Sequence, residues 1–258
     1  MNEHLDAVLA IASDLLRQAS EADSPLNPTD FYCEGWMTAL TLAVVNDNNI
    51  DLSPFRAADG GRWWREAGLR SPINNIGTTW ADAVLGHFDR RAGTKRGIKL
   101  RPDATQFVVV EAKINAPLSA STKNADDFDQ VARNVASMAC EVNLAKLDPA
   151  RFTSLGFYVV SSKEHEGTHH SLVDKASIER KMRARIDKSI EPVHTALEQW
   201  YTGPFRRLMD RLTLESITWE SVIERVKQAA PDPGLILDAF YQKCRTLARG
   251  VPREDCLR

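Results

Sequence analysis

The chain of 258 residues has little of several features that mark specialised classes of protein. It contains only four cysteines, far apart and in no CxxC or Cys/His cluster, which argues against a disulfide framework or a zinc site and favours reduced thiols in a cytoplasmic protein. No apolar run approaches the roughly 18 residues of a membrane span, and the N-terminus carries acids where a secretory signal carries bases, so we expect no membrane association. The formal net charge of −2 gives no global attraction to nucleic acid, so any such contact must come from local patches.

What is present is the composition of an ordinary globular protein, with 43% hydrophobic and 26% charged residues. The length suffices for one large domain or two small ones. Because no internal repeat, low-complexity segment or linker divides the chain, we expect a single domain over residues 1–258. This composition is also compatible with a homo-oligomer.

The pattern of apolar residues predicts both helices and strands. Helical spacing occurs in about residues 4–19, 31–46, 126–145 and 172–211. Strand-like runs lie at 81–89, 98–100, 106–114, 155–162 and 216–219, and the last run precedes a helix that begins at Glu220 or Ser221. Residues 51–78 are expected to form a loop, because prolines and glycines interrupt any period. The order predicts an α/β fold with a mixed central sheet flanked by helices.

The run QFVVVEAKI, residues 106–114, combines an apolar strand with two charges near its end. Residues i and i+2 of a strand point the same way, so Glu111 and Lys113 share one face. An unpartnered buried ion costs several kcal/mol by an order-of-magnitude estimate, so the two charges need partners or water. They could form an ion pair with each other, lie at a solvated strand end, or belong to a functional site.

This strand resembles the Glu-x-Lys strand of the PD-(D/E)XK nuclease superfamily, in which an Asp comes from the preceding strand. The resemblance covers about residues 30–165, and GTTWADAVLGHFD and DATQFVVVEAK are similar to uncharacterised bacterial members. It implies a restriction-endonuclease-like fold with helical additions at both ends. It also implies that two acids hold Mg²⁺ (or Mn²⁺) and that Lys113 orients or deprotonates the attacking water. Carboxylates suit such a hard cation, and a cation beside the phosphate stabilises the charge that grows there.

Two aspartates are candidates for the partner acid. Asp103 belongs to a literal Pro-Asp pair but lies in an RPDATQ stretch that is typical of a turn. It precedes Phe107, which is itself about 13 Å from Glu111 in an extended strand. Asp82 begins the other strand, and antiparallel pairing of 82–89 with 106–113 would place it beside Lys113 and close to Glu111. We favour Asp82 as the metal ligand with Glu111, and keep Asp103 as the alternative.

Two further polar residues match the resemblance. Glu34 is the only charged residue between Phe31 and Val45, and many members of the superfamily direct a Glu from this helix at the metal. It could instead be favoured by the positive end of the helix dipole. Gln130 lies on the helix after the Glu-x-Lys strand, where some lineages direct a Gln at the active site. Those lineages often carry a Tyr four residues later, whereas this chain has Asn134, and Gln130 could equally face solvent.

Other segments allow weaker interpretations. Arg90–Arg101 carries six basic residues and no acid, and is expected at the far end of its hairpin from the carboxylates, either contacting phosphate or simply solvated. Trp63 and Trp64 are expected in a loop. We favour packing of their rings over the core or against a partner surface rather than stacking on nucleic-acid bases. The histidines of KEHEGTHH, residues 163–170, lack zinc-like spacing and are expected in a polar loop.

The expected function is metal-dependent hydrolysis of phosphodiester bonds in nucleic acid, with DNA as the favoured substrate. Glu34, Asp82, Glu111, Lys113 and Gln130 are the candidate catalytic residues. The main alternative is a catalytically inactive protein of the same fold that binds nucleic acid or a protein partner, and near-neutral charge favours this alternative. A third possibility is an Mg²⁺ enzyme acting on a small phosphoester.

Overall fold

The computed structural model describes residues 28–73, 78–118, 128–167 and 172–247, together with residues 11, 13 and 18. Apart from those three isolated residues, the helix expected at 4–19 lies outside the described part. His169 and His170 lie outside it as well. None of the helices in the described ranges is long and apolar enough to cross a membrane.

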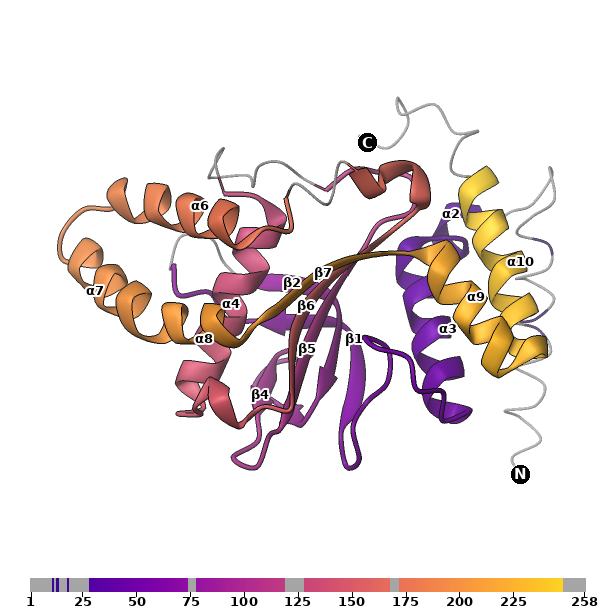
Figure 1. Cartoon of the computed structure of the whole chain (residues 1–258), viewed down its shortest axis with the longest axis horizontal. Coiled ribbons are helices and arrows are strands. Elements are labelled where there is room, and N and C mark those ends of the chain that lie inside the picture. Colours follow the sequence, from indigo (N-terminus) through magenta and orange to yellow (C-terminus); the bar gives the residue numbers. More distant parts are fainter. Residues whose placement is uncertain are drawn as a thin grey trace.

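A mixed sheet of five strands forms the centre, in the order β1-β2-β5-β6-β7 (Figure 1). The strands are β1 (Arg62–Leu69), β2 (Thr79–Gly86), β5 (Gln106–Ala112), β6 (Ser154–Ser161) and β7 (Thr213–Thr218). The β1-β2 and β2-β5 pairs are antiparallel, whereas β5-β6 and β6-β7 are parallel. The predicted α/β class with a mixed central sheet is therefore confirmed.

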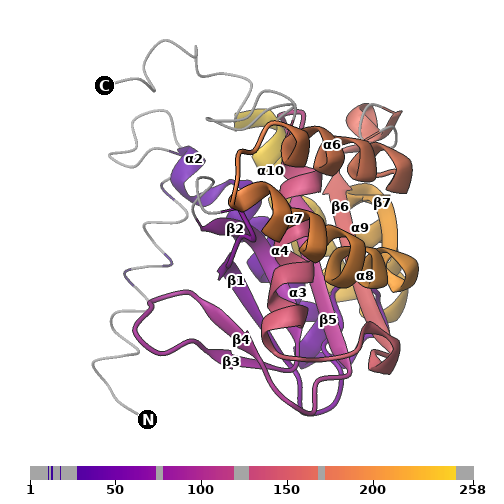
Figure 2. The same cartoon turned by 90° about the vertical axis from the view of Figure 1, so that its left-hand side faces the viewer.

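Helices cover both faces of this sheet (Figures 1 and 2). One face carries α4 (Gln130–Leu144), over which lie α6 (Lys175–Asp187), α7 (Val193–Trp200), the π-helical turn η4 (Tyr201–Phe205) and α8 (Arg206–Arg211). The other face carries α3 (Glu34–Asp47), α9 (Trp219–Ala229) and α10 (Pro231–Leu247), with α2 (Pro28–Phe31) before α3. Short 3-10 turns occupy Pro149–Arg151 and Lys163–His165. The sheet thus separates two apolar cores.

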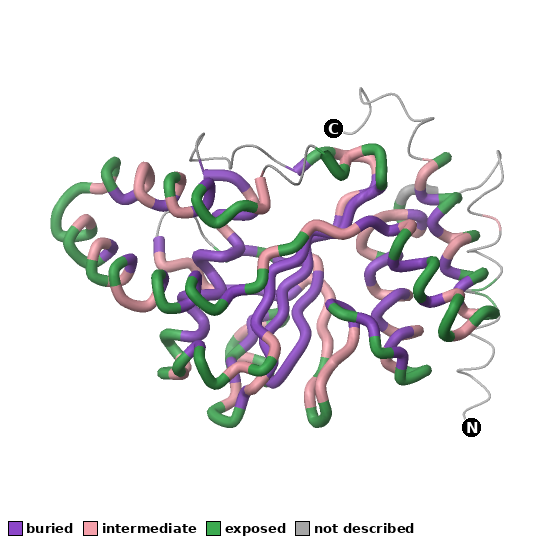
Figure 3. Tube along the Cα trace, in the orientation of Figure 1, coloured by how far each residue is buried: buried purple, intermediate pink, exposed green. Residues whose placement is uncertain are grey.

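Strand β5 is buried along its whole length, and Figure 3 shows the central strands as the most enclosed part of the chain. Phe107 and Val109 join the core on the α4 side, while Val108 and Val110 join the core on the α3 side. This alternation explains the continuous apolar run, since both faces of the strand exclude water. Glu111 continues the strand into this enclosed environment.

Strand β1 occupies part of the segment that was expected to be a loop, so that prediction is wrong for residues 62–69. Its sequence RWWREAGL shows no regular alternation of apolar and polar residues, because the side chains switch from one face of the sheet to the other partway along the strand. Glu66 adopts a φ of 52°, and both Trp64 before it and Ala67 after it pack on the α4-side core. A period-two pattern cannot reveal a strand that is broken in this way.

The strand predicted at 81–89 is divided at Gly86, which has a φ of 128°. A Cβ added there would lie 2.0 Å from the Gln106 carbonyl oxygen, so no other residue type fits this turn. The chain then leaves the main sheet and forms β3 (Phe88–Arg90), which pairs with β4 (Ile98–Leu100) as a separate ribbon (Figure 2). The strand predicted at 98–100 is confirmed in its extent.

The C-terminal half also departs from the prediction in detail. The helix expected over 172–211 is interrupted between Lys188 and Pro192, because a proline cannot continue the preceding helix. The strand expected at 216–219 begins earlier and ends at Thr218. The side chain of Thr218 accepts a hydrogen bond from the Ser221 N–H and caps α9, which begins at Trp219, one residue before the earlier of the two predicted starts, Glu220 and Ser221.

Candidate functional site

The register of β2 against β5 brings Asp82 and Glu111 together. Ala83 pairs with Val110 in the predicted antiparallel arrangement, so the next positions along the two strands are Asp82 and Glu111. The Asp82 Oδ2 accepts a hydrogen bond of 2.8 Å from the Ala112 N–H. The Lys113 Nζ lies 2.6 Å from the Glu111 Oε1 and 3.8 Å from the Asp82 Oδ2. Both carboxylates therefore face one ammonium group.

Glu34 reaches the same point from the opposite side of the sheet. It is the first residue of α3, and its Oε1 accepts a hydrogen bond of 2.8 Å from the Ile114 N–H, one residue beyond Lys113. Its carboxylate interacts electrostatically with both Lys113 and Asp82. Glu34, Asp82, Glu111 and Lys113 together are called the acidic cluster below: three carboxylates around one lysine.

Helix α4 supplies two amides that bind Glu111. The Gln130 side chain donates to the Glu111 Oε1, and the Asn134 Nδ2 donates to the Oε2 at 3.2 Å. The alternative of a solvent-facing Gln130 is therefore wrong. Asn134 was judged only as a departure from a family pattern, yet its position one helical turn after Gln130 places both amides on the same face. The Asp129 carboxylate caps α4 by accepting from the Ala132 N–H, which fixes where this helix begins.

Burial and the neighbouring charges shift the pKa values of Glu34, Glu111 and Lys113. Burial raises the pKa of Glu111 well above its ordinary value, the negative charge of Asp82 raises it further, and Lys113 opposes both. Burial also raises the pKa of Glu34, against the opposing effects of Lys113 and the Ile114 N–H. Burial lowers the pKa of the Lys113 ammonium, but the surrounding carboxylates outweigh it and hold that pKa above its ordinary value. With one ammonium among three acids, the cluster has an excess of negative charge whenever its acids are ionised.

The alternative aspartate, Asp103, is not part of this cluster. It follows the ribbon and precedes β5, at the end of the strand opposite to Glu111. Its side chain is exposed and binds Arg101, whose Nε lies 3.0 Å from the Asp103 Oδ1, and this hydrogen bond lowers the pKa of Asp103. Of the two candidates, only Asp82 lies beside Glu111.

The donor chemistry of the cluster suits a hard divalent cation. Across the described ranges, no three Asp, Glu, His or Cys side chains are arranged as a metal-ligand group. Mg²⁺ is commonly held by only one or two protein carboxylates, with water and substrate phosphate completing its shell. Asp82 and Glu111 supply such a pair, and their mutual electrostatic repulsion is what a bound cation would relieve. The residues present therefore fit Mg²⁺ or Mn²⁺.

The tip of the basic segment Arg90–Arg101 does not lie where the sequence predicted, whereas its last residue, Arg101, lies beside His87 at the Gly86 end of β2. The β3-β4 ribbon folds back along β1, and the Gly68 N–H donates to the Arg96 carbonyl at 2.7 Å. Gly68 in turn pairs with Trp80, two residues before Asp82. The tip of the ribbon is therefore at the same end of β2 as Asp82, and the prediction that it lies at the far end from the carboxylates is wrong. The turn at Gly86 redirects the chain and causes this difference.

The remaining candidates make local contacts outside the acidic cluster. Trp64 stacks on Phe88 with ring centroids 6.3 Å apart, and Trp63 packs against the core on the α3 side. Both tryptophans therefore pack against other residues, as predicted, but they lie on strand β1 and not in a loop. His165 ends a 3-10 turn, where its Nε2 lies 3.8 Å from the Glu164 Oε1.

Comparisons with protein-family models, with curated proteins and with solved structures find no match. The interpretation of the site therefore depends on its own geometry.

Proposed function

We propose that this protein is a metal-dependent nuclease that hydrolyses phosphodiester bonds of DNA, with a restriction-endonuclease-like fold of the PD-(D/E)XK type. The observation that carries the proposal is the meeting of Asp82, Glu111 and Lys113 where β2 begins and β5 ends. An Asp from one strand and a Glu-x-Lys from its neighbour are the arrangement that the sequence resemblance implies. The mixed sheet with α3 and α4 on opposite faces is compatible with that fold.

Asp82 and Glu111 are the proposed ligands of Mg²⁺ or Mn²⁺, with Glu34 assisting. When bound, the ion would supply polarisation of the scissile phosphate and neutralisation of the charge that develops there. Glu111 can provide an oxygen in a fixed direction, because Gln130 and Asn134 bind its carboxylate from α4. These two amides are positioning residues in this account, since they act through Glu111.

Lys113 is proposed to orient the attacking water and to stabilise the charge that grows on the phosphoryl oxygens. Its side chain is only 13% exposed, so its charge acts in a partly dehydrated environment where electrostatic interactions are stronger than in water. In the metal-free protein the neighbouring carboxylates hold the pKa of Lys113 above its ordinary value, so Lys113 is a cation and a hydrogen-bond donor in that state.

A second function deserves a test because protein groups already bind every carboxylate of the cluster. Glu34 accepts from Ile114, Asp82 accepts from Ala112, and Glu111 accepts from Lys113, Gln130 and Asn134. Such a network could also stabilise an inactive protein of this fold that binds nucleic acid or a protein partner. In that case the acidic cluster would be a structural feature alone.

The proposal is tested by incubating the purified protein with Mn²⁺ and a panel of plasmid, linear duplex DNA, single-stranded DNA and RNA. We expect cleavage of at least one DNA substrate, suppressed by EDTA and abolished in Glu111→Ala. Asp103→Asn is the matched control, because it removes the competing candidate acid without touching the cluster, and it should cleave like wild type. Cleavage by Glu111→Ala at the wild-type rate, or no cleavage of any substrate by wild type, would contradict the proposal.

A further inference from the structure

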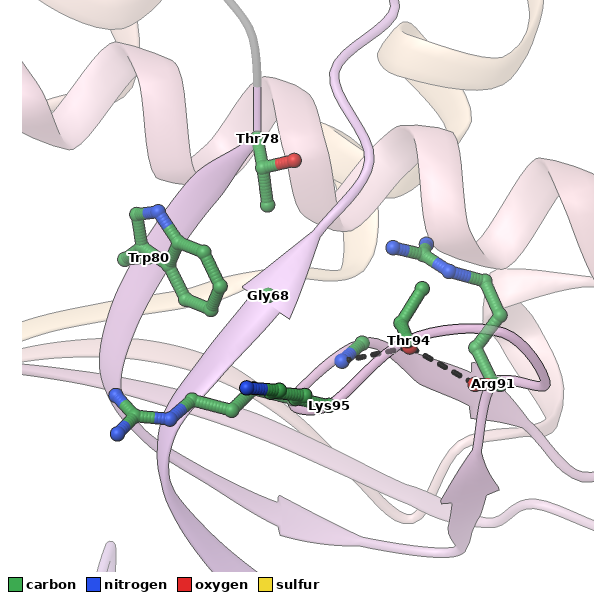
Figure 4. Close-up of a pocket in the computed structure, with 8 residues that line it drawn as sticks. Gly68, Thr78, Trp80, Arg91, Thr94 and Lys95 are labelled. Carbon is green, nitrogen blue, oxygen red and sulfur yellow. Dashed lines mark hydrogen bonds between the residues drawn. The ribbon is translucent and has the colours of Figure 1, made fainter.

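A pocket of about 300 Å³ lies between the end of β1, the start of β2 and the tip of the ribbon (Figure 4). Its lining residues are Gly68, Thr78, Trp80, Arg91, Thr94, Lys95, Arg96 and Gly97. The volume is at the lower end of the range of small-molecule sites. Three of the lining residues are basic, none is acidic, and one is a tryptophan, so the pocket pairs positive charge with an aromatic ring.

Trp80 is an unusual residue to leave on the surface. It is 54% exposed, although it lies in the interior of the sheet order, on β2. Its direct partner on β1 is Gly68, and a Cβ added to Gly68 would lie 3.2 Å from the Trp80 ring. The glycine thus lets the ring lie against β1, as Figure 4 shows, while much of the indole stays accessible. An accessible indole supported in this way can stack on another planar ring.

The cations of the pocket are held by a fixed backbone. The Thr94 Oγ1 donates to the Arg91 carbonyl at 2.8 Å and accepts from the Gly97 N–H at 3.0 Å, and these bonds shape the tip of the ribbon (Figure 4). The Arg91 Nη1 lies 3.5 Å from the buried Glu141 Oε1, which ties the tip to α4. The bond from Gly68 to Arg96 ties it to β1.

Lys95 and Arg96 are the exposed basic side chains of the pocket. Lys95 is exposed and makes no ion pair with any residue in the described part of the chain. Arg96 pairs with Glu66 but stays 51% exposed. Both can therefore contact an anionic group that enters beside Trp80, and phosphate is the anion that lysine and arginine bind in nucleic acids.

We propose that this pocket binds an unpaired base of a DNA strand, with the base stacked on Trp80 and its flanking phosphate contacted by Lys95 and Arg96. The proposal rests on the proposed nuclease function and narrows its substrate to single-stranded or locally unpaired DNA. A base inside a duplex is covered by its neighbours on both faces, so it cannot offer a face to the indole, whereas every unpaired base can.

The position of the pocket relates it to the acidic cluster. Trp80 precedes Asp82 by two strand residues, which separates their Cα atoms by about 6–7 Å. The pocket and the acidic cluster therefore lie at the same end of β2, so that one DNA strand can contact both.

The test is a binding measurement by fluorescence anisotropy, with wild-type protein in EDTA and a fluorescein-labelled oligonucleotide, so that binding is read without cleavage. We expect single-stranded DNA to bind more tightly than the same sequence as a duplex. Trp80→Ala should weaken single-strand binding by about tenfold, the usual scale of one stacked base, and Trp80→Phe should retain most of the affinity. A strand that lacks its bases should bind wild type and Trp80→Ala with the same affinity, equal to the reduced affinity of Trp80→Ala for the intact strand.

Matched controls separate the pocket from general effects. Trp36→Ala removes another exposed tryptophan, 41% exposed on α3 and outside the pocket, and should leave binding unchanged. Lys95→Ala should weaken binding and reduce its salt dependence, whereas Lys99→Ala, which removes an exposed lysine of the same ribbon outside the pocket, should have a smaller effect.

The proposal would be overturned if Trp80→Ala bound single-stranded DNA with wild-type affinity, or if Trp36→Ala lost as much affinity as Trp80→Ala. It would also be overturned if the wild-type protein bound duplex DNA or RNA more tightly than single-stranded DNA. These outcomes are distinct from failure of the nuclease function. A protein that cleaves DNA but ignores Trp80 refutes only the pocket, and one that binds through Trp80 without ever cleaving refutes only the nuclease.

Discussion

The Asp82 Oδ2 accepts a hydrogen bond of 2.8 Å from the backbone N–H of Ala112. Ala112 stands between Glu111 and Lys113, so this single bond places the aspartate beside both of them. The bond follows from the pairing of Ala83 with Val110, which sets the register of the two strands. The relative placement of Asp82, Glu111 and Lys113 is therefore a property of the sheet, and substitutions of these residues can be interpreted against a fixed backbone.

Metal binding should depend on Asp82 and not on Asp103. Asp82→Asn removes one proposed ligand charge while keeping a side chain that can still accept the Ala112 N–H. In isothermal titration calorimetry with Mn²⁺, wild type should bind one ion and Asp82→Asn should bind at least tenfold more weakly, as expected when one of two carboxylate ligands is lost. Asp103→Asn should bind like wild type, since Asp103 is exposed and pairs with Arg101. Equal effects of the two substitutions would contradict the assignment.

Lys113→Ala should abolish most of the catalytic rate while sparing the fold. Loss of one group that stabilises the transition state typically lowers kcat by about a hundredfold or more. Single-turnover cleavage rates measure this directly, and circular dichroism checks that the sheet is retained. Lys99→Ala is the matched control, because Lys99 is an exposed lysine of β4 that makes no contact with the cluster. A rate for Lys113→Ala within a few-fold of wild type would remove Lys113 from the mechanism.

Glu111 should make the metal-free protein less stable as the pH rises. Its pKa in the folded state is raised above the ordinary value of 4.5, so the folded protein favours the protonated form. The associated stability is fully present below that ordinary pKa and is lost as the pH rises through the folded-state pKa. Lys113 does not obscure this trend at neutral pH, because its own raised pKa places its titration at alkaline pH.

Thermal unfolding of Glu111→Gln tests this dependence. The amide cannot ionise, so the melting temperature of the variant in EDTA should exceed that of wild type at about pH 8, and the difference should shrink towards about pH 4. Adding Mn²⁺ should stabilise wild type more than the variant, because the variant lacks one of the two proposed ligand charges. A variant that is less stable than wild type at every pH would show that the carboxylate stabilises the fold.

The sequence predicted the parts of this site that depend on short-range patterns. The apolar run before Glu111 marked β5, the lone charge of the 31–46 segment marked Glu34, and strand pairing selected Asp82 over Asp103. Each of these follows from a regular period or from local chain geometry.

The parts that were missed depend on irregular backbone. The positive φ of Glu66 concealed β1, and the turn at Gly86 sent the basic ribbon back towards Asp82. Neither conformation can be read from a period of apolar residues, because a single residue changes the direction of the chain. The Asn134 contact does not follow from the family pattern, but its spacing of four residues from Gln130 on one helix face indicates it.

Glu141 should stabilise the ribbon that carries the pocket. Its side chain is completely buried and binds Arg70 through its Oε2 at 2.5 Å, with Arg91 at 3.5 Å from the Oε1. Glu141→Gln removes the charge from these bonds and should lower the free energy of unfolding by about 1.5–3 kcal/mol, the range for hydrogen bonds to charged groups. Urea unfolding measures the change, and Glu215→Gln, at an exposed position of β7, is the neutral control.

The most direct test of the central claim is anomalous X-ray scattering from a crystal of the protein grown with Mn²⁺. A single strong peak is expected about 2 Å from carboxylate oxygens of both Asp82 and Glu111, beside Lys113. A manganese peak bound by other residues, with none between Asp82 and Glu111, would contradict it.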